Sequence, residues 1–183
     1  YWIAGWSLGG TVAFELALQI ENQGEELAFL ALIDSPGPDT VAGEENREFT
    51  LQSQLEWIWD SLPDESIKDK LTRVKEIKNL WPTIIEFLEE NNVTVDIVKS
   101  MIPEFLSRII PNYHSLGLRE LIHYLNLNRT LIRARGMYVP DGKINSPLHF
   151  FSATQSSSGL PEGWSTFCAR SVKVKDITGD HFS

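Results

Sequence analysis

The sequence predicts an α/β fold, in which a mostly parallel sheet is built from strands that alternate with helices. Short, nearly continuous apolar runs of strand length recur along the chain, and segments with helical periodicity separate them. Runs of this kind are typical of parallel strands, because both faces of such strands are buried. More than a hundred residues separate the second run from the third, which predicts a large insertion between two strands. We expect one domain over residues 1–183.

The first strand and helix lie at the start of the chain. Residues 1–4, Tyr-Trp-Ile-Ala, predict a buried strand that is already under way. Residues 10–23 carry apolar side chains at helical spacing, and Gly24 predicts the C-terminal end of that helix. Since the sequence lacks an initiator Met and opens inside an apolar run, we expect the chain to be a piece of a longer protein.

Three further strands are predicted. Residues 27–33 form a continuous apolar run, and the sequence Asp-Ser-Pro-Gly-Pro over residues 34–38 ends it. Residues 148–153 and 172–177 are the third and fourth strands. In the last of these, valines alternate with lysines, as expected for a strand at the edge of a sheet.

Residues 39 to about 115 predict a helical lid inserted into the sheet domain. Apolar stripes at helical spacing lie at Leu51, Leu55, Ile58 and Leu62, at Ile84, Ile85 and Leu88, and at Val95, Val98, Ile102 and Phe105. The insertion holds 15 acidic and 8 basic residues, so we expect its outer face to be acidic and well solvated. A longer helix from Leu118 follows, with Arg133 and Arg135 near its C-terminal end, and Gly136 would end it.

Composition excludes several classes of function. The net charge is −9 and the isoelectric point is about 4.9, which argues against binding to nucleic acid or to an anionic membrane surface. Cys168 is the single cysteine, so we expect no disulfide framework and no zinc or iron–sulfur site. No apolar run is long enough to span a membrane, and no targeting signal is visible. We expect a cytoplasmic protein.

The segment Gly5-Trp6-Ser7-Leu8-Gly9 follows the first strand directly and opens the first helix. This G-x-S-x-G motif between a strand and a helix is the nucleophile elbow of an α/β-hydrolase, which predicts Ser7 as a catalytic nucleophile. Small residues flank the serine because neighbouring backbone passes close to it, and Gly5, Gly9 and Gly10 meet that demand. The backbone N–H of Leu8, at the helix N-terminus, is a candidate donor to an oxyanion.

A serine hydroxyl needs a histidine to take its proton, and four histidines compete for that role. His114 and His123 lie in or beside the insertion, and His149 lies inside an apolar strand, where a structural role is the commoner explanation. His181 follows the last strand, at the carboxyl-end rim where sites form in parallel sheets. We therefore predict His181 as the general base.

The third member of a serine triad is a carboxylate that orients the histidine. Asp34 ends the second strand at the same rim, and the loop after the third strand holds no carboxylate before Glu162. Asp180 adjoins His181 and would reach its ring poorly, and Asp176 lies on the strand itself. The prediction is therefore Asp34.

No cofactor or metal is expected. Clustered metal ligands are not visible in the sequence, and the glycines of the elbow lack the lysine of a P-loop and the spacing of a dinucleotide-binding loop.

Taken with these residues, the sequence resembles the C-terminal type I thioesterase domains of nonribosomal peptide and polyketide synthases. The resemblance rests on Gly-Trp-Ser-Leu-Gly-Gly, on the strand Leu-Ala-Leu-Ile-Asp-Ser, on the long helical lid and on the closing Gly-Asp-His-Phe. It is specific at the two ends of the chain, and the lid matches only in character. It implies that Ser7, Asp34 and His181 form the catalytic triad.

The resemblance also implies a reaction and a partner. Ser7 would attack a thioester on the phosphopantetheine arm of a carrier protein domain, and the acyl-enzyme would be released by hydrolysis or by macrocyclisation. The chemistry of the acyl chain, and whether the domain acts in cis or edits misprimed carriers in trans, stay open. Trp57, Trp59 and Trp81 could line the space under the lid, although single tryptophans on helices belong more often to the core.

One departure from the family affects the site. The family's sheet begins with several strands before the elbow, and one of the two oxyanion donors comes from that part. We expect the first strand of this chain on its own to be an open apolar edge that pairs with another copy, and activity to be weak. Two alternatives remain: a stand-alone carboxylesterase or lipase, and a non-catalytic binding module on the same fold.

Overall fold

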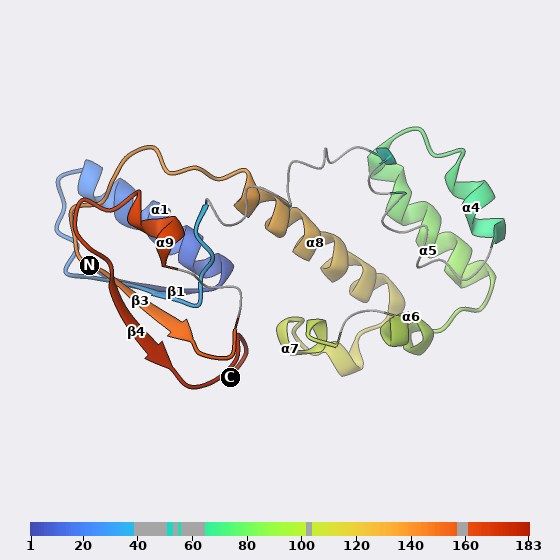
Figure 1. Ribbon diagram of the computed structural model, residues 1–183. Coiled ribbons are helices and arrows are strands. Elements are labelled where there is room, and N and C mark those ends of the chain that lie inside the picture. The colour runs from blue at the N-terminus through green and yellow to red at the C-terminus, as the bar shows by residue number, and fades with distance from the viewer. Residues whose placement is uncertain (39–50, 53–54, 56–64, 102–103, 157–160) are drawn as a thin grey trace. The chain divides into compact units, whose positions relative to one another are not determined.

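A computed structural model describes residues 1–38, 51–52, 55, 65–101, 104–156 and 161–183. The chain divides into two compact units (Figure 1). Each unit has its own hydrophobic core. The sheet unit comprises Tyr1–Asn46 and Thr130–Ser183, and the helical unit comprises Arg47–Arg129.

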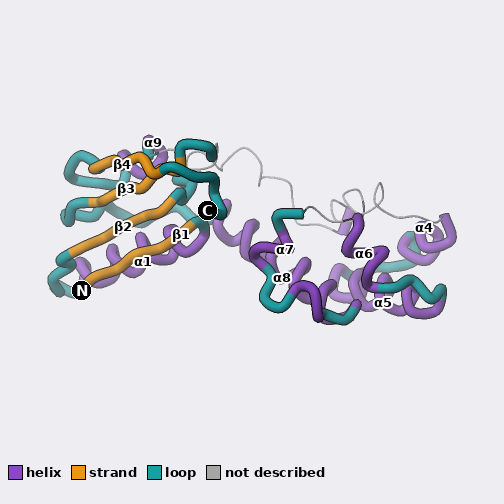
Figure 2. The backbone as a smooth tube through the Cα atoms, turned by 90° about the horizontal axis from the view of Figure 1, so that it is seen from below, coloured by secondary structure: helices purple, strands orange, loops and turns teal. Residues whose placement is uncertain are grey.

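The sheet unit contains four strands: β1 (Trp2–Trp6), β2 (Phe29–Ile33), β3 (Leu148–Ala153) and β4 (Lys173–Ile177). They lie in the order β1-β2-β3-β4 (Figure 2). Every neighbouring pair is parallel. The predicted parallel α/β sheet is therefore confirmed. Because all four strands run the same way, their carboxyl ends meet at one edge of the sheet.

The strands fall where the apolar runs predict them, with small differences at their ends. β3 has the predicted bounds, whereas β2 begins at Phe29, two residues after the start of its apolar run. Leu27 is nevertheless buried in the core, so its hydrophobicity reflects packing rather than strand pairing. β4 is an edge strand of this sheet, as its pattern predicts, although its apolar side chains are exposed along with its lysines. β1 forms the opposite edge.

α1 (Leu8–Asn22) packs on one face of the sheet. Its buried residues, with Phe14 at their centre, meet the inward side chains of β2 and β3, such as Leu30 and Phe150. The fully buried Trp164 on α9 (Glu162–Ser165) completes this core, and its ring lies 4.7 Å from that of Phe14. The helix begins at Leu8 rather than at the expected residue 10, because the elbow leads directly into its first turn.

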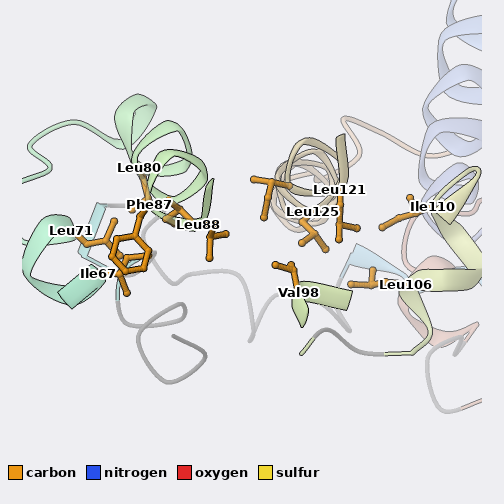
Figure 3. Close-up of a cluster of buried hydrophobic side chains, with 12 residues drawn as sticks. Ile67, Leu71, Leu80, Phe87, Leu88, Val98, Leu106, Ile110, Leu121 and Leu125 are labelled. Carbon is orange, nitrogen blue, oxygen red and sulfur yellow. The ribbon is translucent and has the colours of Figure 1, made fainter. Parts of the chain in front are cut away.

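The helical unit is built from short helices. These are α4 (Glu65–Leu71), α5 (Leu80–Glu90), α6 (Val95–Met101) and α7 (Leu106–Ile109), with 3₁₀ turns at Ile77–Asn79 and Tyr113–Ser115. The N-terminal part of α8 (Leu118–Gly136) also belongs to it, and this helix ends at the predicted glycine. Figure 3 shows how side chains of α4 and α5 point toward one another and those of α6 and α7 toward α8.

The structure refines the predicted lid. The compact helical unit continues to Arg129, beyond the expected limit near residue 115, because the apolar face of α8 packs into its core. The stripe from Val95 to Phe105 is not one helix, since α6 ends at Met101 and Phe105 is the N-cap of α7. Leu51 and Leu55 pack against the helical core. Ile58, Leu62, Trp57, Trp59 and Ile102 lie outside the described residues.

Trp81, on α5, is partly buried against the core of the helical unit, and the guanidinium of Arg129 lies over its ring at 5.6 Å. This cation–π contact within the unit gives Trp81 a packing role. Among the helices of the described residues, none is long and apolar enough to cross a membrane.

Candidate active site

Three of the predicted site residues meet at the carboxyl edge of the sheet. Ser7 follows β1, Asp34 follows β2, and His181 lies in the segment after β4. The Nε2 atom of His181 lies 2.9 Å from Ser7 Oγ, and its Nδ1 atom lies 2.5 Å from Asp34 Oδ2. The chain thus brings together side chains that are up to 174 positions apart in sequence.

Both ring nitrogens of His181 are engaged, which determines what the arrangement can do. With the proton on Nδ1, the ring donates to the Asp34 carboxylate and accepts from the Ser7 hydroxyl at Nε2. In this tautomer a proton can pass from Ser7 Oγ to the ring, and the carboxylate stabilises the imidazolium that results. The geometry is therefore that of a serine–histidine–aspartate triad.

The elbow holds Ser7 in a strained conformation. Its φ of 52° and ψ of −124° lie outside the common regions for a residue with a side chain. The backbone N–H of Ser7 donates to the carbonyl of Ile33 at 3.0 Å, which continues the pairing of β1 with β2 beyond the strand end. The strain at Ser7 agrees with the strand-to-helix turn that the motif predicts.

The glycines of the elbow differ in how closely other atoms approach them. A Cβ atom on Gly5 would lie 2.1 Å from the carbonyl oxygen of Gly9, and one on Gly10 would lie 2.3 Å from Ser35 Oγ. A Cβ atom on Gly9 would meet no atom within 4 Å. The expectation that close approach requires all three glycines is thus wrong for Gly9, whose own carbonyl is what crowds Gly5.

Ser35 supports the elbow, a role that the sequence did not predict. It is fully buried, and its hydroxyl donates to the backbone carbonyl of Ser7 at 2.7 Å. Its own carbonyl accepts a hydrogen bond from the indole N–H of Trp164 at 2.8 Å. The sequence feature that could have indicated this role is the position of Ser35 directly after Asp34, where the segment leaving β2 has to pass beside the segment leaving β1.

Asp34 is buried, with 2% of its surface exposed, yet it is held as a carboxylate. Burial by itself would raise its pKa, but hydrogen bonds from Ser156, from His181 and from the backbone N–H of Ala153 outweigh burial and lower the pKa below the ordinary value of 3.8. The backbone N–H of Asp34 donates to the carbonyl of Phe151 at 2.7 Å. Ser156 is a second supporting residue that the sequence analysis missed.

The competing acids and histidines have other surroundings. Asp180 accepts from the backbone N–H of Phe182 within its own turn, Asp176 lies on β4, and Glu162 lies in the first turn of α9. The His149 ring packs 4.9 Å from that of Phe29. His114 and His123 belong to the helical unit, where their rings contact Tyr113 and Tyr124.

A cavity of about 340 Å³ opens beside Asp34 and His181. Apolar side chains line most of it: Trp6, Ile33, Phe151, Ala153, Ile177 and Phe182. An apolar wall next to the polar side chains of Asp34 and His181 suits a substrate with a hydrophobic part and one reacting polar group.

Leu8 is the first residue of α1, so its backbone N–H has no acceptor within the helix. This is the position at which the elbow offers an N–H to an oxyanion. No group of three or more metal-ligating side chains occurs in the part of the chain that the structure describes.

The parallel sheet, with the elbow between β1 and α1, defines this protein as one with the α/β-hydrolase fold. The chain belongs to the thioesterase domain family, because the model of that family matches residues 1–183.

Similar proteins carry the domain inside much longer chains. Atromentin synthetase of Tapinella panuoides is 25% identical over 100% of this chain, which corresponds to 18% of that protein. Chondramide synthase cmdD of Chondromyces crocatus is 23% identical over 100% of this chain, which corresponds to 4% of that protein. The chain therefore spans a small part of the relatives that it matches.

Among solved structures, the thioesterase domain of Vlm2, bound with a dodecadepsipeptide, superposes with a TM-score of 0.50 at 21% identity. The match covers 99% of this chain and 58% of that one, and it supports the fold.

Proposed function

We propose that this thioesterase domain releases an acyl or peptidyl chain from the phosphopantetheine arm of a carrier protein domain, through an acyl-enzyme on Ser7. The single observation that carries the proposal is His181, whose two ring nitrogens bridge Ser7 Oγ and Asp34 Oδ2. The names of the matching synthetase relatives support a carrier-bound substrate, because the domain occurs within such enzymes.

In the first half of the reaction, Ser7 Oγ attacks the thioester carbonyl carbon while His181 Nε2 takes the hydroxyl proton. The backbone N–H of Leu8 donates to the oxyanion that forms. When this intermediate collapses, the C–S bond breaks, and the proton on Nε2 passes to the departing phosphopantetheine thiol. The products are an ester on Ser7 and a free carrier thiol.

In the second half, a nucleophile attacks the Ser7 ester, and His181 Nε2 again takes the proton. Water gives a free acid, whereas a hydroxyl or amine within the bound chain gives a ring. The C–O bond to Ser7 then breaks, and Ser7 Oγ recovers its proton from His181. The apolar cavity beside His181 supports the proposal, because it would shelter the start of the acyl chain from water.

Mass spectrometry of the full-length protein after incubation with an acyl-phosphopantetheinyl carrier domain tests this function. We expect an acyl adduct on Ser7 that is absent in Ser7→Ala and that forms much more slowly in His181→Ala, because the base takes part in acylation as well as in deacylation. Ser165→Ala is a matched control, because Ser165 is exposed on α9 and its hydroxyl donates to the carbonyl of Glu162 in the same helix.

Three results would contradict the proposal in different ways. Adduct formation on another residue would remove Ser7 from its role. Turnover of simple esters far above that of the carrier thioester would identify a carboxylesterase or lipase. No adduct and no release from a folded protein would favour a binding module.

A further inference from the structure

Trp6 occupies the variable position just before the nucleophile in the elbow, where the G-x-S-x-G pattern itself specifies no side chain. In this structure its side chain contacts the C-terminal segment after β4. The indole N–H donates to the backbone carbonyl of His181 at 2.9 Å. The residue adjacent to the nucleophile is thus bonded to the main chain of the base.

Trp6 also contacts the ring of His181. The two ring centroids lie 5.0 Å apart and the planes are inclined by 33°, so the indole covers one side of the imidazole. Phe182 approaches the same imidazole at 4.9 Å and an angle of 88°, and it meets the Trp6 ring at 5.9 Å. The rings of Trp6, His181 and Phe182 therefore form a cluster in which each contacts the other two, at distances at which such pairs attract.

His181 lies after β4 in residues that form no helix or strand, so contacts with other elements are needed to hold it in place. The segment after Ile177 has turn bonds of its own, such as that from the Asp180 N–H to Ser183 Oγ at 2.8 Å. The torsion between the imidazole and its Cβ atom has broad minima, so the ring plane is set by its surroundings. The indole face adds a restraint on that plane, and it favours the imidazolium that forms during the reaction.

We propose that Trp6 is a positioning residue that holds the main chain and ring of His181 in register with Ser7, a role that rests on the proposed function. Because Trp6 and Ser7 are consecutive on one backbone, the base is fixed to the strand end that carries the nucleophile. Misplacement of a catalytic group by about 1 Å can reduce a rate about 100-fold. Loss of the Trp6 contacts should therefore slow the chemical step. Trp6 also lines the cavity beside His181, and Leu or Phe at this position keeps that wall apolar, so binding of the acyl chain should change less than the chemical step.

Two substitutions in the full-length protein separate the two contacts. Trp6→Phe keeps an aromatic ring beside His181 and removes the indole N–H, and we expect kcat to fall about three- to tenfold. Trp6→Leu removes both contacts, and we expect kcat to fall about 30- to 100-fold, with KM changed less than about threefold. A higher kcat in Trp6→Phe than in Trp6→Leu would show that the aromatic ring itself helps to hold His181 in place.

Trp2 supplies the matched control. It lies on β1 at the same alternation as Trp6, it is 79% exposed, and its ring stacks on Phe29 at 5.4 Å rather than on His181. Trp2→Leu should leave kcat within about twofold of the wild type. An equal loss of kcat in Trp2→Leu and Trp6→Leu, or a loss that simply follows a fall in Tm, would overturn the proposal.

A second readout does not depend on the natural substrate. A fluorophosphonate labels an activated serine, and its rate reports how well His181 takes the Ser7 proton. Slow labelling in Trp6→Leu, with intermediate labelling in Trp6→Phe, supports the positioning role of Trp6. This holds even if the wild type fails to release carrier-bound chains, because that failure counts against the proposed function alone. Labelling of Trp6→Leu at the wild-type rate overturns the role of Trp6, and an unlabelled wild type overturns both.

Discussion

At the scale of single residues, the site depends on backbone positions that tolerate little change. Ser7 and Asp34 both have positive φ angles, 52° and 41°, although neither is a glycine. Each is held by a backbone bond to the neighbouring strand segment, Ser7 to Ile33 and Asp34 to Phe151. Strain at these two residues persists because the sheet on either side determines where they lie.

Gly5 and Gly9 give a test of this view, because they share one motif and differ in their surroundings. Gly5→Ala places a Cβ atom 2.1 Å from the Gly9 carbonyl oxygen, so backbone has to move, and we expect a loss of about 3 kcal/mol or more in the free energy of unfolding. Gly9→Ala meets no atom within 4 Å and lies in the first turn of α1, so a gain of up to about 1 kcal/mol is expected.

Urea unfolding of the two variants, followed by tryptophan fluorescence, measures both changes. Equal stabilities for Gly5→Ala and Gly9→Ala would show that the close approach in the elbow is not what makes Gly5 necessary.

At the scale of elements, the triad of Ser7, His181 and Asp34 depends on how the strands are joined to the helix that covers them. Glu21, near the end of α1, accepts hydrogen bonds from the backbone N–H groups of Asn145 and Ser146, at 2.7 and 2.8 Å. These residues lie just before β3, whose far end contacts Asp34. Burial would raise the pKa of Glu21, but the bonds from Asn145 and Ser146 outweigh it and lower the pKa, so the group accepts as a carboxylate.

Glu21→Gln should therefore loosen the start of β3. A neutral amide accepts at one oxygen only, and we expect a loss of about 1 kcal/mol, kept small because Glu21 is partly exposed. Hydrogen exchange at the β3 amides measures it, with Glu25→Gln, an exposed neighbour, as the control. The charge at Glu21 stabilises the fold above its ordinary pKa of 4.5 and is lost as pH falls through the lowered value, so the difference between wild type and Glu21→Gln should vanish in acid. A difference that persists there would contradict this role.

At the scale of the whole molecule, the chain builds two hydrophobic cores that share no residue. The core of the sheet unit centres on α1, β2 and β3, and that of the helical unit on α4, α5 and the N-terminal part of α8. Separate cores allow separate opening, because the free energy of local unfolding follows the contacts within each cooperative unit.

Leu80→Ala tests whether the two cores open separately. Leu80 is fully buried in the helical unit, so its truncation should cost about 2–5 kcal/mol there. Hydrogen exchange should accelerate at the amides of α5 and leave those of β2 and β3 protected. Phe150→Ala, in the core of the sheet unit, is the reciprocal variant and should have the opposite pattern. Equal acceleration in both units by either variant would mean that they unfold as one.

The sequence by itself determined the elements and the chemistry that local patterns encode. Apolar runs located β2 and β3, because a parallel strand inside a sheet needs apolar side chains at nearly every position. The alternation of valine and lysine located the edge strand β4. The strand, motif and helix around Ser7 are contiguous, so their order alone identifies the turn and its serine. Asp34 and His181 could be selected because each follows a strand and parallel strands end at one edge.

Only the tertiary structure decided which side chains meet and how closely. The roles of Ser35 and Trp6 could not be read from their positions beside Asp34 and Ser7 alone, since these roles arise from contacts with segments 28 and 175 positions away. The freedom of Gly9 and the division of α8 between two units likewise depend on what packs nearby. A local pattern records the solvent exposure and backbone conformation of its own segment, whereas the site is made by contacts between segments that only the folded chain brings together.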